Sequence, residues 1–581
     1  MKNFFLTLSL FFISFYAMAV PTVITGSVSV NSSGIYNADG YIITPGAELY
    51  MTGGAFYFNP GMGIEVLSHG YLQLIGPNVT LKCASGSSYW KGITIYGDGT
   101  PYNPSDPIPA NWGMQTEGNF IIATAEIGIH MRHEKADYIS GAVTIVGNGY
   151  ARSIRSYTNS TCEFVDNRLY DIRITNNVIT RNYSATNGGT PTVWSNYKFS
   201  SNSPSYVMAM ELVNTNLVTE VREFRISSPA LGIYLNNSNA NLNTCEIFTN
   251  QLGGAAVVHQ ISTNNLTSTS VQNSTIDAHK YGIYSRGSEY LYIYNNEIRS
   301  VYYCMYYKYT LGSKVVNNQI KGSQIGMEFY QCKIARVDAN ICSEHTSKDI
   351  YLFESYDSRL SSNRIGWGTV YLSNEGIHVQ DSENTRIIRN QFKKSKRSIY
   401  FSGLNPIVKI HCNTFYDPSA TIDAAIRVDN NPIDDQGSLG DGGANNYFNA
   451  LPSSTIRVRN TVSTPLTFTN SSAIAGNNPS VNTIFNINPL FNANCSVPKI
   501  AQDAAEVEST KITPVPNPFT DIVTIGERTK AIQIFSISGQ HIQTINTEGV
   551  EVNLGHLESG TYFMVTEDMS GNTSRHKLIK Q

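Results

Sequence analysis

Glu328 and His378 are the best candidates for acid–base chemistry in this sequence. A carboxyl group and an imidazole can give and take protons near neutral pH, as cleavage of a polysaccharide requires. On one face of a sheet with one strand between them, the two would lie about 10 Å apart. That is near the separation of an inverting carboxylate pair, although one partner here is a histidine. The alternative is that they are two polar side chains on a solvent face.

Four tyrosines at the same repeated position are candidates for ligand binding: Tyr284, Tyr306, Tyr351 and Tyr400. A tyrosine ring has an apolar face and a polar tip, which suits stacking on a sugar ring. The alternative is that the rings stack on one another between neighbouring strands and stiffen the sheet. Both roles are compatible.

Asp434, Asp435 and Asp441 form a third candidate cluster, for Ca²⁺, because hard cations prefer several oxygen ligands. Their spacing does not match a known calcium loop. The simpler interpretation is a solvated turn rich in Asp and Gly. We therefore expect no cofactor, with Ca²⁺ as the alternative.

These residues belong to a repeat with a period near 22 residues. One repeated element is Asn-x-apolar, and its Asn positions are Asn296, Asn318, Asn340, Asn363, Asn390 and Asn413. Asn tolerates the left-handed backbone of a sharp corner, and its amide can also bond to the Asn above it in a stack. A short period with two β-rich pieces per unit predicts an all-β fold, a right-handed parallel β-helix.

The second element follows about eight residues later and can be assigned face by face, because side chains alternate along a strand. Its middle residues are apolar and are predicted to face inward: Ile283, Met305, Met327, Ile350, Ile377 and Ile399. The next residue in each repeat then faces outward. This outward column consists of Tyr234, Tyr284, Tyr306, Glu328, Tyr351, His378 and Tyr400.

A parallel β-helix does not fix a function, since lyases, hydrolases, esterases and adhesins share it. The polygalacturonase motifs are missing apart from Asp434-Asp435, and the sequence has no Gly-His-Gly. Gln380-Asp381 resembles one pectin esterase element, but its companion motifs are not recognisable.

The last seventy residues carry several motifs in a fixed order. They run from Pro514-Val515-Pro516-Asn517-Pro518-Phe519, through Gly560-Thr561-Tyr562-Phe563, to Lys580-Gln581. This pattern resembles the type A C-terminal sorting domain of the Bacteroidota type IX secretion system. The resemblance implies a sorting motif that includes Asn517, Pro518, Phe519, Gly560, Tyr562 and Lys580. It also implies partners in the secretion machinery and its sortase, and an outer-surface or secreted location reached through the periplasm.

The domain boundaries follow from these features. Residues 1–19 form a signal peptide, because Lys2 precedes an apolar run that ends at Ala17-Met18-Ala19. We expect the N-terminal cap and first rungs over 20–145, the parallel β-helix over 146–497 and a linker over 498–512. Residues 513–581 form the sorting domain, a small immunoglobulin-like β-sandwich. No other apolar run is long enough to cross a membrane.

The charge and the cysteine content of the chain bear on which partners and metals it can bind. The net charge of −3 over 581 residues gives no electrostatic reason to bind nucleic acid. Eight cysteines in an exported protein permit disulfides, and Cys412 with Cys495 is the first pair to test. None of the spacings suits a zinc site.

Two functions remain. The first is a surface or secreted β-helix protein that binds glycans or adheres without catalysis, with a polysaccharide or a host-surface glycan as partner. The second is a polysaccharide lyase or glycoside hydrolase that acts on an extracellular polysaccharide through the same face.

Overall fold

The computed structural model describes most of residues 20–487 and 521–580. The longer segments left out are 1–19, 97–112, 133–154, 180–193, 201–207, 261–268, 471–480 and 488–520, and several shorter stretches are left out as well. The chain divides into two compact units, 1–495 and 496–581, which are described separately. Every regular element in the described residues is a strand.

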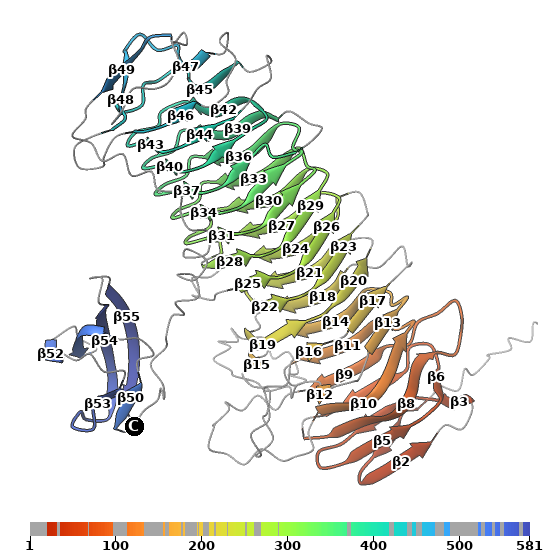
Figure 1. Cartoon of the computed structure of the whole chain (residues 1–581). Coiled ribbons are helices and arrows are strands. Elements are labelled where there is room, and N and C mark those ends of the chain that lie inside the picture. Colours follow the sequence, from red (N-terminus) through yellow and green to blue (C-terminus); the bar gives the residue numbers. More distant parts are fainter. Residues whose placement is uncertain are drawn as a thin grey trace, which may run out of the picture. The chain divides into compact units, whose positions relative to one another are not determined.

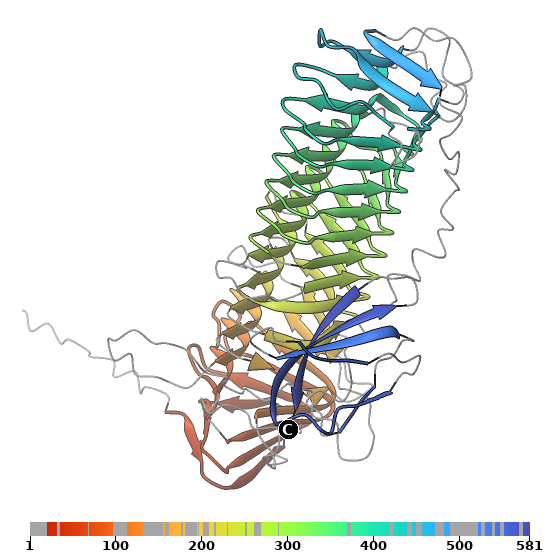
Figure 2. The ribbon, with the colours of Figure 1, turned by 90° about the vertical axis from the view of Figure 1, so that its left-hand side faces the viewer.

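The first unit is a parallel β-helix, which confirms the predicted fold class (Figure 1). From β27 to β44 each turn contributes one strand to each of three parallel sheets, in the chain order sheet A, sheet C, sheet B. Each strand pairs with the equivalent strand of the next turn, so residues 22 to 27 positions apart lie side by side (Figure 2).

Within the described residues, sheet A has 17 strands. They are β1 (Thr22–Ile24), β4 (Tyr41–Ile43), β7 (Gly63–Val66), β9 (Gly92–Tyr96), β11 (Ile127–Arg132), β14 (Tyr170–Thr175), β18 (Met208–Val213), β21 (Leu231–Asn236), β24 (Ala255–Gln260), β27 (Tyr281–Arg286), β30 (Tyr303–Lys308), β33 (Ile325–Tyr330), β36 (Lys348–Phe353), β39 (Ser373–Gln380), β42 (Ser395–Ser402), β45 (Ala424–Val428) and β47 (Ile456–Asn460).

Sheet B runs beside it through β2 (Ser27–Asn31), β3 (Ile35–Ala38), β5 (Glu48–Thr52), β6 (Ala55–Phe58), β8 (Tyr71–Cys83), β10 (Gly113–Ala123), β12 (Arg155–Ser156), β13 (Cys162–Val165), β17 (Tyr197–Ser200), β20 (Arg225–Ser228), β23 (Glu246–Thr249), β26 (Thr275–Ala278), β29 (Glu297–Ser300), β32 (Gln319–Lys321), β35 (Ile341–Ser343), β38 (Arg364–Ile365), β41 (Gln391–Phe392), β44 (Thr414–Phe415) and β46 (Tyr447–Phe448).

Sheet C starts later in the chain. It contains β15 (Val178–Ile179), β16 (Trp194–Ser195), β19 (Asn216–Arg222), β22 (Asn239–Asn243), β25 (Thr269–Gln272), β28 (Leu291–Tyr294), β31 (Lys314–Val316), β34 (Arg336–Asp338), β37 (Arg359–Ser361), β40 (Arg386–Ile388) and β43 (Lys409–His411). A separate parallel pair, β48 (Leu466–Asn470) and β49 (Thr483–Ile487), follows β47.

The interior is filled by columns of like side chains. The residues predicted to face inward on sheet A are all fully buried, from Ile283 to Ile399. Aromatic rings on sheet B stack between turns, with centroids 5.0 Å apart for Phe392 and Phe415 and 4.9 Å apart for Phe415 and Phe448. Such repetition lets each turn bury its apolar face against the next one.

The Asn column is a buried hydrogen-bonded ladder. The side chain of Asn296 donates to Oδ1 of Asn318 at 3.0 Å, and the same bond recurs turn by turn as far as Asn446. One expectation about it was wrong, because the ladder residues themselves are not in the left-handed conformation. The residue before each one has the positive φ, for example Asn295 and Ala339, both at 57°. The amide therefore satisfies backbone groups at the corner rather than making the bend.

Near the N-terminus, Trp90 anchors the early turns. Its ring is fully buried, stacks on Phe58 at 4.5 Å and donates a hydrogen bond from Nε1 to the Ala123 carbonyl at 2.9 Å. Gly92 has a φ of 91°, and a Cβ there would overlap the Ile127 carbonyl oxygen. The Trp-x-Gly-Ile sequence thus meets a packing requirement of this turn.

The second unit consists of two antiparallel sheets. One pairs β50 (Ile522–Thr524) with β53 (Glu551–Asn553), and the other has the order β52 (His541–Ile545), β51 (Thr529–Ser536), β54 (Gly560–Asp568) and β55 (Thr573–Lys580). Residues of both sheets share one apolar core, including Val523, Val552, Ile534 and Met564. An immunoglobulin-like topology remains a prediction.

Candidate functional site: the outward face of sheet A

The outward face of sheet A is set by an irregularity that recurs on many turns. Strands β27, β30 and β36 share one burial pattern, in which the second, third and fifth residues are buried and the first, fourth and sixth are partly or fully exposed. The second residue is skipped on both partner strands in the pairing between turns, so the register is kept while the inward–outward alternation is broken once. Residues three apart, as well as two apart, therefore lie on the same outward face.

The fourth residues of these strands, and the residues paired with them on the other turns, form the predicted outward column. Tyr284, Tyr306, Glu328, Tyr351, His378 and Tyr400 pair in register from turn to turn, and Arg427 and Arg459 continue the column. Upstream, Val258 lies between Tyr234 and Tyr284, so the tyrosine stripe is interrupted there. The sequence did not predict Val258 at this position, because its strand reads Ala256-Val257-Val258 where the neighbouring strands read Gly-Ile-Tyr.

A cluster of four tyrosines covers β27 and β30. The rings of Tyr284 and Tyr306 stack with centroids 5.6 Å apart and planes 9° apart. Tyr281 and Tyr303, which are first residues of the same strands, stack beside them at 5.4 Å. All four side chains are partly exposed. We call these four residues the tyrosine platform.

Glu328 and His378 lie on either side of Tyr351 in the column, with one strand between them, as predicted. They are not on an open solvent face, since they are only 9% and 6% exposed. Burial raises the pKa of Glu328, although nearby Lys348 opposes this shift. The structure therefore shows the predicted placement of the two residues, and their acid–base role remains a prediction.

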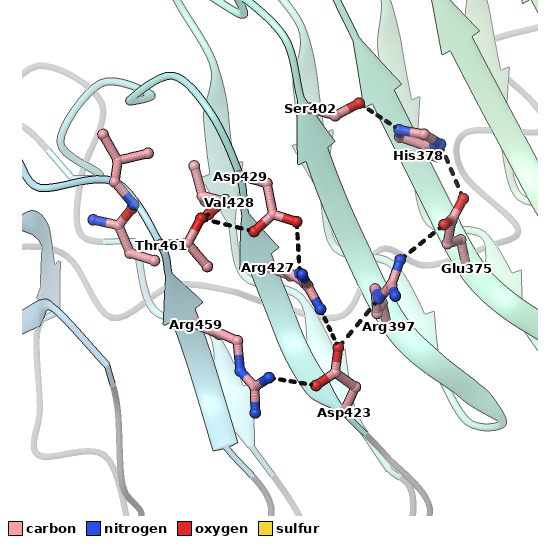
Figure 3. A network of polar contacts seen from close by, with 12 residues as sticks. Glu375, His378, Arg397, Ser402, Asp423, Arg427, Val428, Asp429, Arg459 and Thr461 are labelled. Atoms are coloured by element: carbon pink, nitrogen blue, oxygen red, sulfur yellow. Dashed lines mark hydrogen bonds and ion pairs between the residues drawn. The ribbon is translucent and has the colours of Figure 1, made fainter.

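His378 instead contacts two residues that the sequence did not single out. Its Nε2 lies 2.8 Å from Oγ of Ser402, and its Nδ1 lies 2.9 Å from Oε2 of Glu375 (Figure 3). Its ring is held between Tyr351 and Tyr400, with centroids 4.8 and 4.5 Å away. Burial lowers the pKa of His378 below its ordinary value, although Glu375 opposes this shift.

Glu375 belongs to a network of ion pairs that crosses four turns (Figure 3). Arg397 bonds to Oε1 of Glu375 at 3.1 Å and to Asp423 at 3.2 Å. Asp423 also binds Arg427 at 2.7 Å and Arg459 at 2.9 Å. Burial, the largest single influence, would raise the pKa of Glu375, but the contacts to His378, Lys348 and Arg397 lower it below its ordinary value.

The break in alternation explains why the sequence did not point to Glu375. Strict alternation assigns Glu375 and His378, three positions apart, to opposite faces, whereas the structure places them on one face. Ser402 follows Tyr400 by two and does alternate correctly. It could have been found by placing the last residues of these strands in register, which pairs Ser402 with Gln380.

The remaining predicted sites are less defined. Asp434 and Asp435 are exposed, Oδ1 of Asp435 accepts a hydrogen bond from the Thr467 backbone at 2.7 Å, and Asp441 lies outside the described residues. The described part of the chain contains no group of three His, Cys, Asp or Glu side chains that could hold a metal. Calcium binding remains the untested alternative to a solvated turn.

Cys412 is disulfide-bonded, and its predicted partner Cys495 lies outside the described residues. Five other described cysteines are buried and take part in no disulfide: Cys83, Cys245, Cys304, Cys332 and Cys342.

In the second unit, Gly560 begins β54, and Tyr562 OH donates to the Glu558 carbonyl at 2.8 Å. Lys580 is nearly buried and lies 3.5 Å from Asp521. Asn517, Pro518 and Phe519 lie outside the described residues, as does the predicted signal peptide over residues 1–19.

Residues 515–581 match the family model of the secretion system C-terminal sorting domain. The chain is a type IX secretion substrate. It is thereby directed to the cell surface or the extracellular space. No helix in the described residues combines the length and hydropathy needed to cross a membrane.

Part of the repeat region of this secretion substrate matches a second family model. Residues 239–432 match the model of the periplasmic copper-binding protein NosD. That match covers about a third of the chain, and the described residues contain no group of three or more His, Cys, Asp or Glu side chains that could hold a metal ion. No curated protein matches the chain.

Solved structures of similar fold include a double mutant of the periplasmic alginate epimerase AlgG, at 11% identity and a TM-score of 0.29 over 70% of this chain and 78% of that one. A tailspike mutant of E. coli bacteriophage HK620 in complex with a hexasaccharide matches at 11% identity and 0.33, over 93% and 85%. DFA-IIIase from Arthrobacter chlorophenolicus A6 matches at 13% and 0.24, over 68% and 85%. At these values the likeness carries no statement about function.

Proposed function

We propose that this exported β-helix protein binds an extracellular glycan along the outward face of sheet A. The tyrosine platform is the observation that supports this most directly. Two stacked pairs, Tyr284 with Tyr306 and Tyr281 with Tyr303, lie side by side on successive strands and are partly exposed. Partly exposed aromatic faces with hydroxyl tips suit the apolar faces and hydroxyl groups of sugars.

Polar residues continue the same face beyond the platform. Glu328 is next in the column, and Lys348 lies 3.6 Å above the centre of the Tyr351 ring. A glycan chain that follows the column would pass from rings that stack to groups that form hydrogen bonds and ion pairs. Ligand sites commonly combine a mainly apolar surface with a few fixed polar groups of this kind.

A second candidate, a polysaccharide lyase or glycoside hydrolase, is favoured by a different observation. Glu375 and Asp423 lie on either side of Arg397, beside His378 on the same face. A carboxylate pair next to a guanidinium is what acid–base cleavage of an acidic polysaccharide needs. Each of these carboxylates is, however, already engaged by arginine, so binding is the better-supported function.

The test is binding of the purified protein to a glycan array, followed by titration of the glycans that bind. Replacing Tyr284 and Tyr306 with Ala should weaken binding at least about tenfold, a loss of about 1.4 kcal/mol. Tyr292→Ala on β28 of sheet C is the matched control and should bind as the unaltered protein does. Equal affinity of the platform variant, or no glycan bound at all, would contradict the proposal. Release of unsaturated product from a polyuronate would favour the lyase instead.

A further inference from the structure

We propose that Ser402, His378 and Glu375 form an acyl-transfer site that hydrolyses ester groups on a glycan. The substrate class is an O-acylated polysaccharide, with the O-acetyl ester as its simplest member. This inference rests on the proposed function in one respect, since the tyrosine platform would bring the glycan to the site. The chemistry itself depends only on the three side chains and their neighbours.

The three residues have the connectivity of a nucleophile, a base and an orienting acid. Ser402 Oγ and Glu375 contact opposite nitrogens of the His378 ring, at 2.8 Å from Nε2 and 2.9 Å from Nδ1. The Nδ1 contact is close but not aligned as a hydrogen bond. Such contacts in a site without its substrate often tighten when the substrate binds.

The protonation states agree with these roles. The pKa of His378 is lowered, chiefly by burial, and the pKa of Glu375 is below its ordinary value. At neutral pH the imidazole is therefore neutral beside an ionised carboxylate. Its proton is then favoured on Nδ1, facing Glu375, which leaves the Nε2 lone pair to accept the hydroxyl proton of Ser402.

Neighbouring side chains hold both His378 and Glu375 in position. The His378 ring lies between the rings of Tyr351 and Tyr400, which limits its rotation. Glu375 Oε1 is bonded to Arg397, so Oε2 remains directed at the imidazole. Preorganisation of this kind distinguishes a catalytic arrangement from an incidental contact.

Gln380 supplies a donor for the oxyanion that ester hydrolysis creates. It pairs in register with Ser402 on the neighbouring turn. Its Oε1 accepts a hydrogen bond from Tyr351 OH at 2.7 Å, which orients the amide. Among the described residues no group accepts a hydrogen bond from Gln380 Nε2, so this nitrogen is available to a substrate. A side-chain amide can stabilise a tetrahedral intermediate in this way.

The reaction balances with water as the only co-reactant. Ser402 Oγ attacks the acyl carbonyl carbon as its proton passes to His378 Nε2. The bond between the carbonyl carbon and the sugar oxygen then breaks, and the proton moves from Nε2 to the departing hydroxyl. Water attacks the acyl-serine with His378 again as base, which releases the carboxylic acid and restores Ser402.

A second His–Ser contact in the same protein provides a contrast. His259 Nδ1 lies 2.8 Å from Ser288 Oγ, but both residues are fully buried in the β-helix. The other ring nitrogen faces the Ser238 carbonyl at 3.0 Å rather than a carboxylate. That contact serves packing, whereas Ser402 is partly exposed on an outward face.

The test uses the full-length exported protein with two probes, a fluorophosphonate label and the small ester 4-nitrophenyl acetate. We expect covalent labelling at Ser402 and measurable hydrolysis. Ser402→Ala should abolish labelling and lower the rate on the order of 100-fold. The matched control Ser288→Ala removes the other His–Ser contact and should keep both activities in the folded protein.

Glu375 is a positioning residue, so its test needs a pH profile. Because Glu375 opposes the lowering of the His378 pKa, Glu375→Gln should lower kcat and move the acid limb of the rate profile to lower pH. Lys348 and Arg397 also face His378 and remain in that variant.

Absence of labelling at Ser402, or an unchanged rate in Ser402→Ala, would overturn the inference. Because 4-nitrophenyl acetate does not need the tyrosine platform, its hydrolysis can succeed when glycan binding fails. Ser402→Ala should also still bind glycan, so the two proposals fail separately.

Discussion

The side-chain amide of Asn318 donates a hydrogen bond to Oδ1 of Asn340 on the next turn, over 2.9 Å. The same oxygen also accepts from the backbone nitrogen of Asn318 at 2.9 Å. Asn340 in turn donates to the Val315 and Asp338 carbonyls and to Asn363. One buried side chain therefore satisfies polar groups on three consecutive turns, which is why the ladder recurs with the period of the fold.

Replacing Asn340 with Ala should destabilise the β-helix by at least about 3 kcal/mol, because several buried polar groups lose their partners. Chemical denaturation of the purified protein measures this as a lower unfolding midpoint. Gln319→Ala, on the exposed side of β32, is the matched control and should stay within about 0.5 kcal/mol. Equal midpoints for the two variants would show that the ladder contributes little to stability.

The buried His259 should make the protein sensitive to acid. Burial lowers its pKa from 6.5 to about 4. Between those values the unfolded chain binds a proton that the folded chain does not, so stability falls as the pH falls. This group accounts for about 2 kcal/mol between pH 7 and pH 5.

Denaturation at both pH values tests that expectation. His259→Gln should lose less stability on acidification than the unaltered protein, although His130 and His345 also have pKa values near 4 and retain part of the effect. Gln319→Ala, at an exposed position, should keep the full pH dependence. The same dependence in His259→Gln would mean that this ring is protonated in the folded state.

Gly92 is required by the close approach of the neighbouring turn. Gly92→Ala would place a methyl group on the Ile127 carbonyl oxygen at a φ of 91°, which should cost more than about 3 kcal/mol. Gly86→Ala is the control, since an added methyl group there meets no atom within 4 Å. Thermal unfolding compares the two, and a similar Tm for both would contradict this account of the Trp90-x-Gly92 sequence.

The parts of the fold that the sequence predicts are those that repeat with simple spacing. The inward column from Ile283 to Ile399 and the outward column from Tyr284 to Tyr400 follow from alternation, and the structure shows both. The neighbours of His378 do not follow from it. A break in the alternation, where two consecutive residues are buried, puts Glu375 on the same face, and only the pairing of turns brings Ser402 into contact.

The corner chemistry was misassigned for a related reason. Asn is common both at left-handed positions and in ladders, so its identity cannot say which role it plays. The structure separates the roles, because Ala339, Ser362 and Arg389 take the positive φ where Asn295 and Asn317 do so on other turns. From Asn296 to Asn446 the ladder position always carries an amide side chain. The corner residue before it, in contrast, can be of several types.

Deleting residues 513–581 should stop export at the periplasm, because the sorting domain lies in that segment. The two units have separate apolar cores, so the truncated chain retains every residue of the β-helix core. Cell fractionation and protease treatment of intact cells measure where the truncated and full-length chains are found. Detection of the truncated chain in the periplasm rules out degradation as the cause of its absence outside. If the truncated chain still reaches the cell surface, export does not depend on this domain.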